Sequence, residues 1–154
     1  MPFDSPSPAD PSVPETDPTE AQATALPADQ DTAQGPRIDA DVVITPAAGV
    51  DGAEAFPGLL RRVLAYNDRL MLVEHVMEEG SVFPRHSHPH EQLAYLVSGR
   101  VRVVAGDETF EAGPGDSFVV RGGVEHQVWA LERSVALDVF TPFREDYVEW
   151  VDGR

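Results

Sequence analysis

Three of the five histidines in this chain have the spacing expected of ligands to a divalent transition metal. The pattern is Gly80-x5-His86-x-His88-x3-Gln92-x6-Gly99 in one stretch and Gly115-x6-Gly122-x3-His126 in a second. In an extended segment, residues two apart point to the same face, so His86 and His88 project together. Imidazoles brought together from separate strands hold metals such as Zn, Ni, Mn or Fe, and the two glycine-bounded stretches together predict such a site.

Gln92 is the predicted fourth ligand, although its neighbour Glu91 carries a carboxylate. In a strand, Gln92 shares its face with Ala94 and Leu96, which suit an interior position, whereas Glu91 points the opposite way. Three neutral imidazoles and a neutral amide leave the full double charge on the metal. This favours Lewis-acid polarisation of a substrate oxygen over the oxygen chemistry of carboxylate-bearing Fe(II) sites.

The two remaining histidines are not predicted to be ligands. His90 lies in a His-Pro-His-Glu turn, where a solvated or rim position is expected. His75 lies within an apolar run, where it either faces an interior cavity or makes a hydrogen bond in the core. Strand parity alone leaves both alternatives for His75 open.

The segments that must position these ligands have the pattern of short β-strands separated by Gly, Pro and charged turns. The expected strands cover residues 42–45, 59–66, 69–77, 83–88, 92–97, 100–105, 109–112, 116–120, 127–131 and 134–140. Strands this short, with hardly any helical periodicity, indicate a sandwich or a barrel. Only residues 144–151 are predicted to form a helical turn or two.

Composition divides the chain into a tail and one folded domain. Residues 1–36 hold eight of the fourteen prolines, seven acidic residues and no basic residue, which predicts a disordered acidic tail. Residues 37–154 are expected to form the domain.

A net charge of −16 argues against nucleic acid and anionic membranes as partners. The sequence lacks the basic start of a signal peptide, an apolar span and any cysteine, so a cytoplasmic protein is expected.

Two further stretches accompany the ligand motif His86-Ser-His88-Pro-His-Glu-Gln92. They are Tyr95-x2-Ser98-Gly99 and Leu137-Asp138-Val139-Phe140-Thr141-Pro142-x-Arg144-Glu145-Asp146-Tyr147. With them the chain resembles the cupin superfamily and, more closely, small single-domain cupins similar to the pectin-degradation protein KdgF. The resemblance implies an all-β, cupin-type double-stranded β-helix, which is a jelly-roll barrel with a short C-terminal helical turn. It also implies a metal held by three His and one Gln.

The resemblance further implies an activity and the residues for it. Members of this group convert a 4,5-unsaturated uronate, released by pectate or alginate breakdown, into its linear keto form. The residues implicated in that reaction correspond to Asp138, Phe140 and Arg144. Asp138 is expected to act as general acid or base, Arg144 to pair with the substrate carboxylate and Phe140 to pack on the sugar ring. Alternatively, Asp138 and Arg144 form an ion pair with each other and Phe140 belongs to the core.

Other functions remain open on the residues alone. One is a cupin dioxygenase with Fe(II), which the neutral Gln92 disfavours. Others are a polyketide-cyclase-like cupin and a non-catalytic module that binds a sugar or a metal. The resemblance also implies pairing through sheet edges, and residues 42–45 are the expected contribution of this chain to a homodimer.

Overall fold

The computed structural model describes residues 39–152. The chain divides into two units, residues 1–34 and 35–154, and the described residues belong to the second. The tail predicted for residues 1–36 lies outside the described residues.

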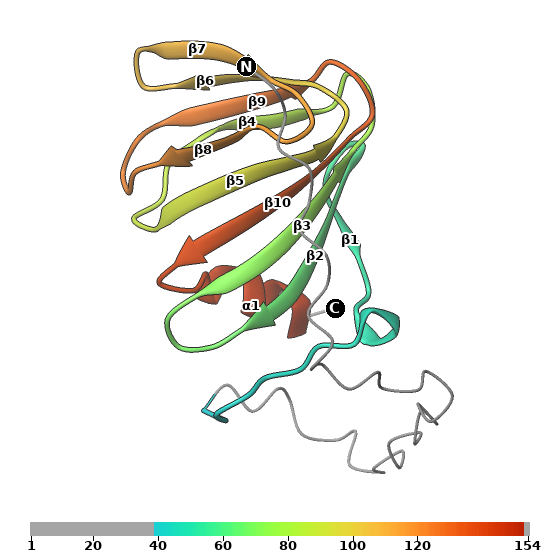
Figure 1. Cartoon of the computed structure of the whole chain (residues 1–154), viewed down its shortest axis with the longest axis vertical. Helices are drawn as coiled ribbons and strands as arrows, with labels where there is room; N and C mark the ends of the chain where they lie inside the picture. Colours follow the sequence, from blue (N-terminus) through green and yellow to red (C-terminus); the bar gives the residue numbers. More distant parts are fainter. Residues whose placement is uncertain (1–38, 153–154) are drawn as a thin grey trace, which may run out of the picture. The chain divides into compact units, whose positions relative to one another are not determined.

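The described chain forms two antiparallel sheets and a C-terminal helix (Figure 1). The strands are β1 (Ala53–Phe56), β2 (Leu59–Tyr66), β3 (Met71–Met77), β4 (Val82–His86), β5 (Glu91–Ser98), β6 (Val101–Ala105), β7 (Glu108–Ala112), β8 (Ser117–Val120), β9 (His126–Ala130) and β10 (Ser134–Thr141), followed by α1 (Glu145–Asp152). The six-stranded sheet has the order β1-β2-β3-β10-β5-β8, and the four-stranded sheet has the order β4-β9-β6-β7. The predicted all-β architecture with one short C-terminal helix is confirmed.

Side chains alternate between the interior and solvent along the central strands, as the period of two requires. On β5, Ala94 and Leu96 are buried while Leu93 and Tyr95 are exposed. Strand β10 lies between β3 and β5 and pairs with both. The inward faces of these three strands therefore meet at the centre of the six-stranded sheet.

The apolar interior consists of two clusters. The larger one joins the two sheets and includes Leu59, Met77, Leu96, Val101 and Val103. The smaller one contains Val63, Met71, Val73, Phe140 and Tyr147, so it includes a residue of α1 and fixes this helix near β2. Within the described residues no helix has the length and apolarity needed to cross a membrane.

The prediction of a strand at residues 42–45 is wrong. These residues pair with no strand, and Val42 and Ile44 are 72% and 77% exposed. The neighbour of β2 is β1 instead, which follows later in the chain and joins β2 through a turn with Gly58 at a φ of 72°. Because this short turn delivers β1 directly to β2, the free edge of β2 is already paired. Residues 42–45 therefore do not extend the sheet beside β2.

Candidate metal centre

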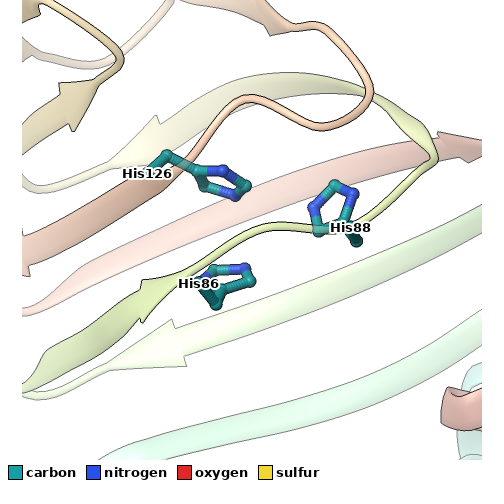
Figure 2. A group of neighbouring side chains, drawn as sticks. All are labelled: His86, His88 and His126. Carbon is teal, nitrogen blue, oxygen red and sulfur yellow. The ribbon is translucent and has the colours of Figure 1, made fainter.

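Three histidines converge at one end of the four-stranded sheet. His86 is the last residue of β4 and His126 is the first residue of β9, and the two face each other in the antiparallel register. His88 follows β4 in the loop that leads to β5. One nitrogen from each ring lies within 4.8 Å of those from the other two. Figure 2 shows the three side chains close together, two from one segment and one from another.

Each of the three imidazoles donates a hydrogen bond from Nδ1 to a nearby backbone carbonyl oxygen. The contacts run from His86 to Pro84 at 2.8 Å, from His88 to His90 at 3.0 Å and from His126 to Val124 at 2.9 Å. A carbonyl oxygen only accepts hydrogen bonds, so Nδ1 carries the proton in all three rings. The lone pair of each neutral ring is therefore on Nε2. This arrangement is common to metal-ligating histidines, because the carbonyl holds both the tautomer and the orientation of the ring.

Gln92 brings a fourth lone pair to the same place. Its Oε1 lies 3.1 Å from Nε2 of His88, and its Nε2 donates to Oδ1 of Asp138 at 2.9 Å. Nε2 of His126 is buried and has no hydrogen-bond partner among the described residues. Amide oxygen and unprotonated imidazole nitrogen are both acceptors, so the contact between Gln92 and His88 is repulsive unless a cation lies between the atoms. The donor set of three Nε2 atoms and one Oε1 thus fits a divalent transition metal.

The charge state of the imidazoles suits the same role. Desolvation by burial lowers the pKa of His86 from 6.5 to about 4. Burial also lowers the pKa of His88, and the nearby positive charge of Arg144 lowers it further. Both rings are therefore neutral at pH 7. A neutral imidazole is the form that binds a metal, since a proton on Nε2 would occupy the same lone pair.

Glu91, the acidic neighbour of Gln92 in the sequence, points away from the three imidazoles, as strand parity requires. Glu91 is exposed, and its Oε1 accepts a hydrogen bond from the backbone N–H of Gly122 at 3.4 Å. A side chain on Gly122 would collide with the carbonyl oxygen of Pro89. The close approach of Gly122 thus holds the loop between β4 and β5, which carries His88.

Asp138 and Phe140 lie on the inward face of β10 and are 5% and 1% exposed. Asp138 does not form the ion pair with Arg144 that the sequence allowed: its Oδ2 lies 2.7 Å from Nδ1 of His75. Phe140 belongs to the smaller core cluster, and its ring centroid also lies 5.6 Å from that of His88. Phe140 is therefore both a core residue and a neighbour of His88, a predicted ligand.

Arg144 is 7% exposed and follows β10. Its Nε and Nη2 donate to the two carboxylate oxygens of Asp146 at 2.9 and 2.7 Å. Its Nη1 is buried without a hydrogen-bond partner among the described residues. The guanidinium lies 4.0 Å from the ring centroid of Tyr147. Arg144 is thus held in a fixed position, and its Nη1 amino group is available for a further hydrogen bond.

His75 meets both alternatives that the sequence left open, because it lines the cavity and its Nδ1 lies 2.7 Å from Oδ2 of Asp138. Arg61, whose Nε donates to Nε2 of His75 at 3.3 Å, was not identified from the sequence. A signal for the burial of both existed, because the period of two places His75 on the same face as the apolar Val73 and Met77. The same rule places Arg61 beside Leu59 on the buried face of β2.

A cavity between the two sheets joins these groups. Its lining includes His75, His86, Gln92, His126, Asp138, Phe140 and Tyr147, together with apolar side chains such as Met77, Phe83, Leu96 and Val128. A largely apolar cavity with a few convergent polar groups is typical of a small-molecule site. Three of the four predicted ligands, His86, Gln92 and His126, therefore face the same cavity as Asp138.

Comparison with known proteins shows which family the chain is similar to. The model of the cupin domain family matches residues 73–140. The pectin degradation protein KdgF of Dickeya dadantii (strain 3937) is 32% identical over 93 residues, which are 59% of this chain and 84% of the relative. The solved structure of KdgF from Halomonas sp. has a TM-score of 0.64 at 32% identity, covering 68% of this chain and 96% of that one. An RmlC-like cupin from Shewanella frigidimarina NCIMB 400 has a TM-score of 0.65 at 29% identity, covering 68% and 94%.

Proposed function

The chain belongs to the cupin superfamily, and we propose that it is a metal-dependent enzyme that converts a 4,5-unsaturated uronate into its linear keto form. The observation that carries the proposal is the convergence of three imidazoles and the Gln92 amide beside the acidic residue Asp138, at a cavity that Asp138 lines. The similarity to KdgF, a pectin degradation protein, supports the choice of substrate.

His86, His88, His126 and Gln92 are the residues that would hold the metal. A divalent metal there would supply Lewis acidity, and four neutral ligands would leave its double charge undiminished for a substrate oxygen. The Nδ1–H bonds to backbone carbonyls keep the three rings in the ligating orientation before any metal binds.

Asp138 is the residue proposed to move the proton. Opening the hemiacetal ring removes the proton of the hydroxyl on C1, breaks the bond between C1 and the ring oxygen, and leaves an enolate at C5. Protonation of C4 then gives the ketone, so one proton leaves the C1 hydroxyl, one proton is added to C4, and the reaction is an isomerisation. The Asp138 carboxylate lines the cavity and can accept the first proton and donate one to C4.

Arg144 and Phe140 are proposed to bind and orient the substrate. The unused Nη1 of Arg144 can donate a charge-assisted hydrogen bond to the uronate carboxylate, while Asp146 holds the rest of the guanidinium. The buried ring of Phe140, beside His88, provides an apolar surface for the sugar and excludes water.

The test is the ultraviolet absorbance of the unsaturated uronate, which disappears when the double bond is lost. Metal-loaded protein is expected to remove this absorbance faster than buffer, and protein treated with a chelator is expected to do so at the non-enzymatic rate. Equal rates with and without metal-loaded protein would refute the proposed reaction. Oxygen consumption with a small diketone or thiol would favour the dioxygenase alternative instead.

A further inference from the structure

A buried chain of hydrogen bonds leads away from the metal ligands towards β2. It runs from Gln92 on β5 to Asp138 on β10, then to His75 on β3 and Arg61 on β2. The three contacts measure 2.9, 2.7 and 3.3 Å. Arg61, His75 and Asp138 are 7%, 3% and 5% exposed. Polar groups this deeply buried are costly unless their hydrogen bonds are made, so each contact has an energetic reason to persist.

The chain of bonds has a single possible direction. Arg61 only donates hydrogen bonds, so Nε2 of His75 must be the accepting nitrogen. The proton of the neutral ring is then on Nδ1, and it is donated to Oδ2 of Asp138. The other carboxylate oxygen accepts from the amide nitrogen of Gln92. The amide oxygen of Gln92 is consequently the end that faces His88.

The direction matters because the two ends of an amide have the same shape, and hydrogen-bond partners alone decide which end points where. Without a metal, the amide would gain a hydrogen bond by turning its NH₂ group towards the free Nε2 of His88. It would then present donors, which cannot ligate, to the metal site. The contact with Asp138 opposes this reversal, because the amide oxygen would face a carboxylate oxygen.

We propose that Arg61 and His75 are positioning residues that, through Asp138, hold the amide of Gln92 with its oxygen towards the three imidazoles. Arg61 sets the tautomer of His75. The Nδ1–H of His75 then binds Oδ2 of Asp138, which leaves Oδ1 to accept the hydrogen bond from the Gln92 amide. The inference rests on the metal-binding part of the proposed function and does not depend on the uronate reaction.

The first test reads the tautomer of His75 directly. Long-range proton–nitrogen NMR of the metal-free protein is expected to show His75 neutral with the proton on Nδ1. A His75 ring with its proton on Nε2 would overturn the proposal, because Arg61 would then not be its donor.

The second test reverses the amide with an isosteric change. In Asp138→Asn, the N–H of His75 takes the new side-chain oxygen, so the new NH₂ group faces Gln92 and draws the amide oxygen away from the imidazoles. The affinity for Zn²⁺, measured by competition with a chelator, is expected to fall about 10–100-fold, as for other residues that orient a ligand. Unchanged affinity would overturn the proposal. Glu74→Gln is the matched control, because it makes the same change on β3 in a residue that pairs with Arg62 outside the chain of bonds.

The third test restores binding by a second substitution. A carboxylate has an oxygen at both ends, so when Asp138→Asn is combined with Gln92→Glu, the new amide at position 138 can donate to one oxygen while the other faces the metal. Zn²⁺ affinity is expected to return at least to that of the unmodified protein. A double variant that binds as weakly as Asp138→Asn alone would overturn the proposal, since a merely structural role of Asp138 gives no such recovery. If these variants show this pattern of Zn²⁺ binding while the unmodified, metal-loaded protein does not turn over the uronate, the proposed reaction is refuted and the positioning role stands.

Discussion

Binding of a metal is expected to stabilise the folded domain, and His126→Ala is expected to abolish this effect. Nε2 of His126 is buried without a hydrogen-bond partner among the described residues, and an amide oxygen lies 3.1 Å from Nε2 of His88. Because the unfolded chain lacks this assembled site, metal at 100 times its dissociation constant adds ~2.7 kcal/mol to the free energy of unfolding. For a domain of this size, ~4 °C per kcal/mol converts that gain into a rise in Tm of about 10 °C.

The metal-free His126→Ala protein should lose little stability by itself. Truncation of a large interior side chain costs roughly 2–5 kcal/mol. The same change removes a buried acceptor without a partner, whose desolvation costs about 1–3 kcal/mol in the unmodified protein. The two effects partly cancel, so the metal-free variant is expected to be destabilised by roughly 1–2 kcal/mol and to remain folded.

The assay is scanning calorimetry with and without Zn²⁺, combined with measurement of bound metal per chain. The unmodified protein should bind one equivalent and show the rise in Tm, and His126→Ala should show neither. His90→Ala is the control, because it keeps the backbone carbonyl that accepts from Nδ1 of His88 and removes a neighbouring imidazole that is not a predicted ligand. A His126→Ala protein that keeps one equivalent of metal and the full rise in Tm would refute the assignment of His126 as a ligand.

Three further predictions concern pH, the ligand loop and the substrate. Burial lowers the pKa of His86 from 6.5 to about 4. Between about pH 4 and pH 6.5, His86 therefore binds a proton more readily in the unfolded chain than in the folded protein. The free energy of unfolding of the metal-free protein should therefore fall as the pH decreases from about 6.5 to about 4; denaturant titrations showing no decrease would contradict this. Gly122→Ala should weaken Zn²⁺ binding because the new methyl group displaces the loop between β4 and β5, whereas Gly49→Ala, with open space around it, should have no effect. Arg144→Lys should raise the KM for the uronate roughly tenfold, since the loss of a charge-assisted hydrogen bond costs about 1.5–3 kcal/mol; an unchanged KM, equal to that of the exposed control Arg133→Lys, would argue against substrate binding by Arg144.

The boundaries of most strands could be predicted because their determinants are local. The expected strand at residues 59–66 coincides with β2, and the expected strand at residues 134–140 is one residue shorter than β10. The error at residues 42–45 has the opposite origin. Apolar β-branched residues favour a strand, but a strand exists only with a partner, and β1 already occupies the edge of the sheet beside β2.

The placement of Gln92 and Glu91 on opposite faces was decided by the sequence alone, because alternate residues of a strand point to opposite faces whatever the rest of the fold does. The spacing of His86 and His88 has the same local origin. Only the tertiary structure decided the partner of Asp138. The ion pair with Arg144 was open on the sequence, but the register of β10 against β3 brings His75 to the carboxylate across 63 residues of chain, and β2 adds Arg61 behind it. Such contacts depend on which strands pair and in what register, and no local pattern contains that information.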